Sequence, residues 1–247
     1  VDLFVAQDRA ETLFQLQSEG QYVLATQAKS FAEADSATNK FAGSTVLDVA
    51  NRMASEYNAF ALPELTLIDE HVQLGRTVYF QDNQLIGYFN REQSRGYLAA
   101  VYTIRNGVMV LDIPDIGTIS LKLENTSSKI TADIVDDVPH FQIEVSCKAY
   151  ISEINQDLRK KLSLDVYEKF ETALNEKLKL QIESAVEQAV IRDSTDIFNF
   201  DVALKQQQTE YWKVHRDSWA QELAKIKYTV NVTSSVDRVQ QEASPAF

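Results

Sequence analysis

One uninterrupted amphipathic stretch, residues 164–192, constrains the fold of this chain more than any other segment. Its apolar side chains recur at steps of three, four and one, which follow the 3.6-residue period of an α-helix. The stretch has no glycine or proline and is rich in strong helix formers, and Ser163 is placed to cap its first turn. A helix of roughly 40 Å, at 1.5 Å per residue, needs an extended apolar surface to pack against. The apolar residues are Tyr167, Phe170, Leu174, Leu178, Ile182, Ala185, Val186 and Ala189.

Strands that precede this helix supply such a surface. In residues 118–124 every second side chain is apolar, and the same alternation returns in residues 130–134 and 141–151. Turn-forming residues at Asn125–Ser128 and Asp136–Pro139 separate these segments. The pattern predicts three strands of an antiparallel meander with one apolar face, and the long helix is expected to pack on that face.

The remainder of the second half completes this sheet. A short strand at residues 108–111 precedes the meander, and a last strand at Lys225–Thr233 joins the sheet through a long connection. From Ser234 onward the polar chain is expected to fray. The connection is rich in aromatic residues, which we expect to pack against the end of the long helix and not to form a binding surface. They are Phe198, Phe200, Tyr211, Trp212 and Trp219.

The first half of the chain has a mixed pattern. It predicts a strand at residues 1–6, helices at 7–17, 22–34 and 44–57, and strands at 65–72, 77–80 and 85–89. The third helix has an apolar face of Val46, Leu47, Val49, Ala50 and Met53, and Asp82-Asn83 forms a hairpin turn between the last two strands.

Polar residues cluster at Arg91–Gly96, where the pattern changes from short mixed elements to a regular meander. We therefore expect an α+β fold with two domains. Residues 1–92 form a smaller α+β domain. Residues 93–247 form an antiparallel sheet with the long amphipathic helix on one face.

Charge and composition exclude several classes of protein. The net charge of −12 disfavours nucleic acid and anionic membrane surfaces as partners. The single cysteine, Cys147, excludes an intramolecular disulfide and a cysteine-based zinc cluster. No segment reaches the ~20 apolar residues of a membrane helix, and the chain does not open with a signal peptide. Its opening residues, Val1 to Val5, are typical of the middle of a domain, so we expect a fragment of a longer protein.

The histidines and the cysteine do not have the spacing of a catalytic or metal site. His71, His140 and His215 are far apart in the sequence, and each is interpreted as a surface or structural residue. Cys147 lies on the apolar face of its strand, so it is interpreted as a core residue and not as a nucleophile.

The acidic residues likewise form no recognisable site. Asp133, Asp136 and Asp137 cluster near a turn, but they lack the ligand spacing and the glycine of a calcium loop, so a solvated turn is favoured. The sequence has no glycine-rich phosphate loop and no nucleophile elbow. We expect no catalytic, cofactor-binding or metal-binding residues.

Four groups of residues follow one another along the chain in a characteristic order. Leu62-Pro63 comes first, before the small sheet. The second group is Gly75-x-x-Val78-x-Phe80, Leu85-Ile86-Gly87-Tyr88-Phe89 and Glu92-x-x-x-Gly96. The third group is the alternating strands with the long helix. The fourth group is Asp196-Ile197-Phe198-Asn199-Phe200, Trp212 and Trp219, followed by the last strand.

In this order the chain resembles the Ger(x)C family, the C subunits of bacterial nutrient germinant receptors in spores. Asn199 stands where the family often has glycine, and asparagine also tolerates a left-handed backbone. The family's closing glycine after the last strand is missing. The resemblance implies that this chain comprises the middle and C-terminal domains of a palmitate-bearing lipoprotein.

The resemblance also implies a location and partners. The protein is expected at the spore inner membrane, with its soluble part on the outer side, held there by an N-terminal lipid that is absent from this chain. It is expected to assemble with the A and B membrane subunits of the receptor and to act in germination without enzymatic activity, cofactor or nucleic-acid partner.

A second hypothesis is an extracytoplasmic hydrolase or small-ligand-binding enzyme that uses surface carboxylates such as Asp133 and Glu144. The two hypotheses differ in one structural expectation. An enzyme needs a deep pocket in which polar groups converge.

Overall fold

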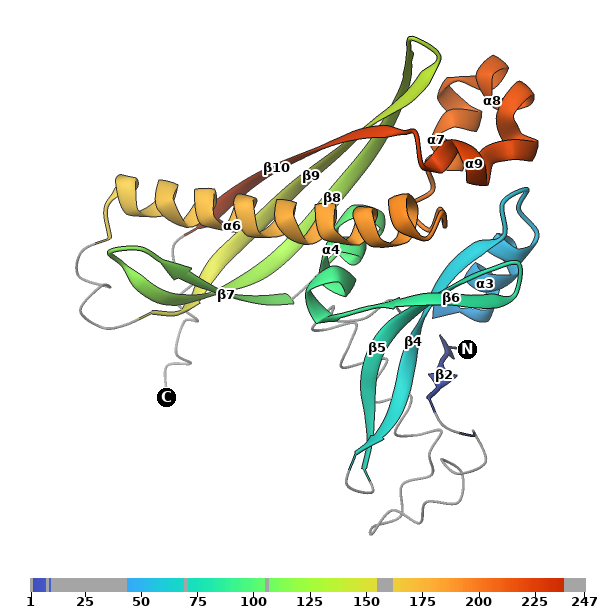
Figure 1. Cartoon of the computed structure of the whole chain (residues 1–247). Coiled ribbons are helices and arrows are strands. Elements are labelled where there is room, and N and C mark those ends of the chain that lie inside the picture. Colours follow the sequence, from blue (N-terminus) through green and yellow to red (C-terminus); the bar gives the residue numbers. More distant parts are fainter. Residues whose placement is uncertain are drawn as a thin grey trace.

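Two four-stranded β-sheets and one long helix form the framework of the computed structural model (Figure 1). The structure describes residues 2–7, 9, 44–68, 71–104, 107–154 and 162–237. Apart from Gln7 and Arg9, the helices predicted at residues 7–17 and 22–34 lie outside the described residues. The predicted α+β fold class is confirmed.

The C-terminal sheet has the strand order β10-β9-β8-β7. β7 (Gly107–Ile113), β8 (Gly117–Val135) and β9 (Val138–Glu153) pair antiparallel, and the predicted antiparallel pairing of residues 130–134 with 141–151 is present. Asp136 and Asp137 form the turn between β8 and β9 with φ angles of 51° and 61°, which a two-residue hairpin turn requires. β10 (Lys227–Asp237) joins the sheet as predicted but runs parallel to β9, so the complete sheet is mixed.

β8 is one continuous strand, and the turn predicted at Asn125–Ser128 is wrong. A β-bulge between Leu123 and Asn125 takes its place. One additional residue moves all the following side chains to the opposite face, so the inward positions change from odd to even numbers along β8. Thr126 is buried just after the bulge, where its hydroxyl accepts the N–H of Ile104 at 2.7 Å.

The predicted long helix is present as α6 (Leu164–Val186), continued by the π-helical η1 (Glu187–Arg192). Ser163 occupies the N-cap position, but its side chain makes no capping hydrogen bond. Its carbonyl oxygen instead accepts the N–H groups of Val166 and Tyr167, at 3.1 Å and 3.2 Å. The predicted apolar stripe is buried from Phe170 to Ala189, and Tyr167 is half-buried.

α6 lies across the C-terminal sheet within the connection from β9 to β10 (Figure 1). Parallel neighbouring strands require such a crossover, because the chain must return to the end of the sheet where the previous strand began. The inward residues Ile119, Leu121, Ile143 and Val145 are at most 2% exposed, and they share one hydrophobic core with the α6 stripe. The predicted packing of the helix on this face is confirmed.

The end of β10 is held by α6. The prediction that the chain frays from Ser234 is wrong for the described residues, because β10 continues to Asp237. The Ser234 hydroxyl donates to the carbonyl oxygen of Glu171 at 3.3 Å, and the Glu171 carboxylate accepts the N–H of Val236 at 2.9 Å.

The N-terminal sheet has the strand order β2-β4-β5-β6. β2 (Val5–Ala6) is parallel to β4 (Ala59–Ile68), and β5 (His71–Gln81) pairs antiparallel with both β4 and β6 (Gln84–Phe89). Asp82-Asn83 forms the predicted hairpin turn, with φ angles of 49° and 63°. The single strand predicted at residues 65–72 is wrong, because this stretch contains the end of β4 and the start of β5. β1 (Asp2–Leu3) and β3 (Ser44–Thr45) form a separate pair.

α3 (Val46–Met53) is shorter than the helix predicted at residues 44–57. Thr45 and Asp48 form a capping box at its start: the Asp48 N–H donates to the Thr45 hydroxyl oxygen at 3.2 Å, and the Asp48 carboxylate accepts the Thr45 N–H at 3.0 Å. In its predicted apolar face only Val49 is buried; Val46, Leu47, Ala50 and Met53 are exposed.

α4 (Arg91–Val101) occupies the segment in which the sequence indicated a domain boundary. The side chains of Asn90 and Gln93 form a capping box at its start, so the polar residues of this segment belong to the first turn of a helix. Residues 97–100 are buried in the core. The division into residues 1–92 and 93–247 concerns independent folding and stays a prediction.

The aromatic-rich segment folds into short helices at one end of the C-terminal sheet (Figure 1). These are α7 (Phe200–Gln207), α8 (Thr209–His215), η2 (Arg216–Ser218) and α9 (Trp219–Leu223). Phe198, Phe200, Trp212 and Trp219 are buried, and Tyr211 is half-buried. Phe200 stacks on Phe141 of β9 with ring centroids 4.2 Å apart. The aromatic set packs in the core as predicted, but within the described residues its ring contacts outside the segment are with Phe141 of β9 and Tyr97 of α4 instead of with the end of α6.

Truncation of the α6 stripe tests the packing of the helix on the sheet. Leu174 and Leu178 have no exposed surface, so Leu174→Ala and Leu178→Ala should each lower the free energy of unfolding by about 2–5 kcal/mol. Glu176→Ala, on the exposed face of the same helix, is the control and should change it by less than about 0.5 kcal/mol. Urea unfolding of the three variants measures this, and equal small effects at all three positions would contradict the packing.

Expression of residues 93–247 alone tests the proposed domain division. This fragment keeps most of α4, α6 and the C-terminal sheet, so we expect it to fold and to unfold cooperatively. It should be less stable than the whole chain, because Phe89 and Tyr79 pack on one another and Phe89 packs on Tyr97 of α4. Near-UV circular dichroism and thermal unfolding decide the question. A fragment without cooperative unfolding would show that the two halves fold as one unit.

Candidate functional site

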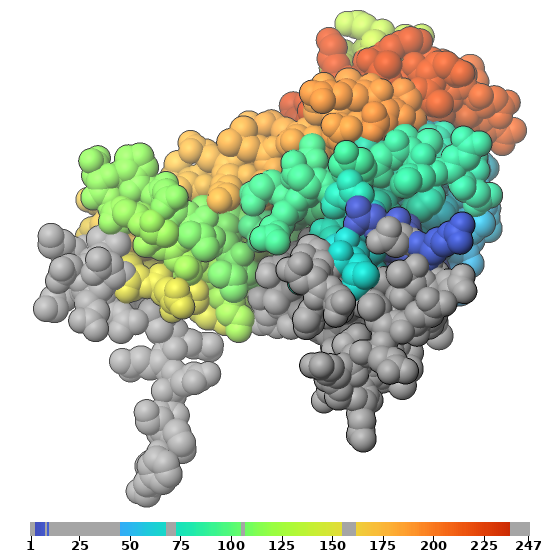
Figure 2. Space-filling view, turned by 60° about the horizontal axis from the view of Figure 1, so that its bottom comes forward, coloured from blue at the N-terminus to red at the C-terminus, as the bar shows by residue number. Residues whose placement is uncertain are grey.

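α4 and α6 cross in direct backbone contact at Gly96. A Cβ atom on Gly96 would lie 2.1 Å from the carbonyl oxygen of Gln181 and 2.6 Å from the amide nitrogen of Ile182. Gln181 is buried, and its side-chain amide donates to the carboxylate of Glu92 in the first turn of α4. In the space-filling view the surface of α6 meets that of α4 and the N-terminal sheet in a continuous seam (Figure 2). Glycine at this position lets the two halves of the molecule share one core.

A second close contact lies at Gly87 in β6. A Cβ atom there would lie 2.4 Å from the hydroxyl oxygen of Tyr79. That hydroxyl donates to the carboxylate of Asp193, which also accepts from the side-chain amide of Gln188 at 3.2 Å. Burial raises the pKa of Tyr79, so the phenol remains a donor. Asp193 follows the π-helical turn directly, so the end of α6 is joined to the N-terminal sheet.

The loop after α6, where the C-terminal helices meet the end of α6 and the N-terminal sheet, is called the junction. Among the described side chains of this junction, Asp196 accepts the most hydrogen bonds. It is 1% exposed and accepts four N–H groups. One carboxylate oxygen accepts the backbone N–H of Phe198 at 3.2 Å and of Phe200 at 3.0 Å, and the other accepts the N–H of Asp201 at 2.7 Å and the indole N–H of Trp219 at 3.1 Å. Asp196 therefore satisfies the first free N–H groups of α7 and ties that helix to α9.

Asn199 occupies the N-cap position of α7 in the left-handed conformation, with φ 66° and ψ 31°. Its side chain makes no capping hydrogen bond, because Asp196 already accepts the N–H groups of Phe200 and Asp201. The expectation that Asn199 adopts the backbone conformation of the glycine it replaces is confirmed. Its side-chain oxygen is buried without a hydrogen-bond partner among the described residues.

Asp201 forms a buried carboxyl pair with Asp196. Burial, followed by the negative charge of Asp196, raises the pKa of Asp201 to about 7. Burial also raises the pKa of Asp196, but its four N–H donors and Arg52 oppose that effect. Because the donors all point to Asp196, the charge of the pair resides there. Asp201 is therefore the member of the pair that carries a proton below about pH 7.

Three further hydrogen bonds join the segment after α3 to the C-terminal helices and to the loop that precedes them. The Glu56 carboxylate accepts the indole N–H of Trp212 at 2.9 Å and the ammonium group of Lys205 at 3.0 Å. The hydroxyl of Tyr57 donates to the carbonyl oxygen of Ser194 at 2.8 Å. Segments far apart in the sequence therefore meet around the loop that contains Asp196.

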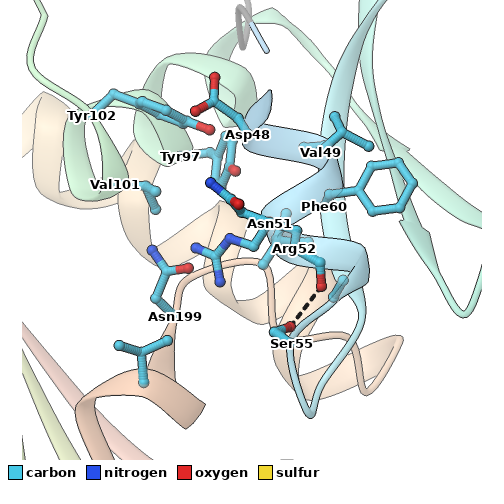
Figure 3. Close-up of a pocket in the computed structure, with 14 residues that line it drawn as sticks. Asp48, Val49, Asn51, Arg52, Ser55, Phe60, Tyr97, Val101, Tyr102 and Asn199 are labelled. Atoms are coloured by element: carbon cyan, nitrogen blue, oxygen red, sulfur yellow. Dashed lines mark hydrogen bonds between the residues drawn. The ribbon is translucent and has the colours of Figure 1, made fainter. Parts of the chain in front are cut away.

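A pocket of about 410 Å³ opens beside this junction (Figure 3). α3, β4, the end of α4 and the segment around Asn199 form its walls. The guanidinium group of Arg52 points into it, near the side-chain amides of Asn51 and Asn199, and Tyr102 lies at its upper edge in the view of Figure 3. Val101, Ile197 and Val202 contribute apolar surface. The pocket therefore combines one cation and one carboxylate, that of Asp48, with amide and apolar surface.

Cys147, His140 and His215 lie in structural positions, whereas the side chain of His71 lies outside the described part of the structure. Cys147 is 4% exposed, and burial raises the pKa of its thiol to about 12, so it is a core residue. His215 stacks on Tyr211 with ring centroids 3.9 Å apart, and His140 lies opposite Asp133 in the β8–β9 ladder. Within the described part of the chain no group of three or more His, Cys, Asp or Glu residues could hold a metal ion.

The carboxylates of the enzyme hypothesis are not brought together. Asp133 pairs with His140, whereas Glu144 pairs with Lys129, four residues further along both strands. Asp133, Asp136 and Asp137 are exposed at the β8–β9 turn. The pocket contains neither Asp133 nor Glu144.

Sequence reasoning missed the residues that meet in and around the pocket. Arg52, Glu56 and Tyr57 lie at the end of a predicted helix whose period gave them no role, and Asp201 lies next to the Asp196–Phe200 motif but outside it. The sequence signal that could have indicated this region is the motif Asp196–Phe200 itself. In it an Asp is followed by aromatic residues and by an Asn that adopts the left-handed conformation at the start of α7.

The fold matches a solved structure described as "Crystal Structure of the GerBC protein". The TM-score is 0.69 at 13% sequence identity, and the match covers 95% of this chain and 68% of that chain. At this identity the likeness concerns the fold. No curated protein sequence matches the chain.

The sequence model of one protein family matches this chain. The model described as "Spore germination B3/ GerAC like, C-terminal" matches residues 75–240, about two thirds of the chain. The chain therefore belongs to this family, and the resemblance to Ger(x)C proteins is confirmed. No helix in the described ranges is long and apolar enough to cross a bilayer.

The carboxyl pair predicts a pH dependence of stability. The pKa of Asp201 is raised in the folded state, so this group binds more protons folded than unfolded between roughly pH 4 and pH 7. Its contribution to stability is present at acid pH and is lost as the pH rises through this window, with a slope of at most about 1.4 kcal/mol per pH unit. Asp201→Asn should remove that slope and be more stable than the unmodified chain at pH 8.

Urea unfolding at several pH values, compared between the variant and the unmodified chain, measures this effect. Asp115→Asn is the matched control, because Asp115 is an exposed turn residue with φ 64° that asparagine also tolerates. It should follow the pH profile of the unmodified chain. A profile of Asp201→Asn parallel to that of the unmodified chain would contradict the proposed site of protonation.

Proposed function

We propose that this protein is a non-enzymatic subunit of a spore nutrient germinant receptor. The observation that carries the proposal is the family match over residues 75–240. In this proposal the protein acts in germination as the C subunit, through assembly with the A and B membrane subunits.

The positions of the family-motif residues support a structural role. Gly87 and Gly96 permit close contacts between elements, and Asp196 and Trp219 join the loop after α6 to α7 and α9. Each of these residues is used to hold one element against another. Such contacts produce a rigid body that presents fixed surfaces to partners, which is what an assembly subunit requires.

We further propose attachment at the spore inner membrane through a lipid N-terminal to this chain, with the soluble part on the outer side. A net charge of −12 is repelled by an anionic bilayer surface. One acyl chain alone gives marginal binding. The lipid and the A and B subunits therefore share the attachment in this proposal.

Deletion and recovery experiments test the receptor role. Spores of a strain in which this gene encodes the sole family member should lose nutrient-triggered germination when the gene is deleted and regain it on complementation. A trigger that bypasses the nutrient receptors is the control and should act equally on both strains. After mild crosslinking, the full-length lipidated protein should recover the A and B subunits from spore inner membranes. Unchanged nutrient responses together with absence of both subunits would overturn the proposal.

A further inference from the structure

The pocket beside the junction has the size and the composition of a small-molecule site. Its volume of about 410 Å³ lies within the roughly 300–1,000 Å³ range of ligand pockets. Its walls come from α3, β4, α4 and the segment at the start of α7, so the shape is set by the same packing that fixes the junction. Such a pocket is formed before any ligand arrives.

Arg52 is the one cation among the fourteen residues that line this pocket. Its guanidinium group forms no ion pair within 4.0 Å among the described residues. Two carboxylates in this region, those of Asp48 and Asp196, form hydrogen bonds with other groups. Asp48 is held in the capping box with Thr45, at 2.7 Å and 3.0 Å from the Thr45 hydroxyl oxygen and amide nitrogen. Asp196 accepts four N–H groups of its own loop and of Trp219. The guanidinium donors therefore remain available on the pocket side.

Asn199 supplies a second polar group to the pocket. Its left-handed backbone directs the side chain to the pocket wall, where Figure 3 places its amide beside the guanidinium of Arg52. The amide oxygen lacks a hydrogen-bond partner among the described residues. A bound carboxylate has no donor for this oxygen, so it would contact Asn199 through the amide N–H groups, and an ordered water would satisfy the oxygen.

We propose that this pocket binds a small organic monocarboxylate, with its carboxylate on Arg52 and its apolar part against Val101, Ile197 and Val202. A guanidinium group pairs with a carboxylate through two parallel hydrogen bonds. A dianion such as phosphate fits less well, because Arg52 is the single cation of the lining while Asp48 lines the same pocket and Asp196 lies behind it. The proposal does not depend on the receptor role.

Ligand titrations with defined probes test this site. Hexanoate and benzoate are the carboxylates, hexanamide and benzamide are their neutral matched controls, and inorganic phosphate is the alternative anion. Isothermal titration or ligand-observed NMR with the whole chain should detect both carboxylates and find the amides weaker by roughly tenfold or more, the loss expected for a charge-assisted hydrogen-bonded pair.

Variants locate the binding. Arg52→Gln should weaken carboxylate binding by roughly tenfold or more, and Arg192→Gln, at an exposed arginine that does not line the pocket, should leave it unchanged. Asn199→Gly keeps the left-handed backbone and removes the amide, so it should weaken binding without loss of folding. Thermal unfolding of each variant confirms that the fold is kept.

Three results would overturn the proposal. The first is absence of binding by both carboxylates. The second is equal binding of carboxylates and amides, or tighter binding of phosphate. The third is carboxylate binding that Arg52→Gln leaves unchanged in a folded variant.

Discussion

The buried carboxylate of Asp196 is the interaction on which the central junction of the molecule depends. Its four N–H donors come from three successive segments: the loop after α6, the first turn of α7, and the indole of Trp219 in α9. Burial of a charge is unfavourable unless donors replace the water it loses. Here the replacement is complete at Asp196, and the neighbouring Asp201 adapts by keeping its proton.

The two glycines at the junction explain how two sheets of different origin in the sequence share one core. Gly96 brings the backbone of α4 against that of α6, and Gly87 leaves room for the hydroxyl of Tyr79 to reach Asp193. A Cβ atom at Gly96 would force the backbones of α4 and α6 apart, and one at Gly87 would displace the Tyr79 side chain. The hydrophobic core then extends from Tyr79 and Phe89 through Tyr97 to the stripe of α6. In this chain both glycines therefore have a close-packing role.

The elements that sequence predicted best are those whose periodicity reports burial directly. α6 and β9 have one apolar face each, and both follow the predicted pattern over their whole length. β8 was divided wrongly because a bulge and a turn interrupt alternation in the same way. The helix predicted at residues 44–57 is α3, which ends at Met53. Of its predicted apolar face only Val49 is buried.

The candidate site was harder to predict because long-range contacts create it. Glu56 meets Trp212, and Tyr57 meets Ser194, across more than half the chain. Arg52 acquires its environment from α4 and from the loop at Asn199, and no local pattern indicates that such residues will be neighbours.

The parallel pairing of β10 with β9 has a consequence for folding. Val230 pairs with Ile143, so during synthesis this edge of β9 stays unpaired until residues 227–237 emerge, and an unpaired strand edge can pair with another chain. Because this pairing joins segments far apart in the sequence, we expect it to form slowly and to leave the incomplete sheet open to aggregation until it does.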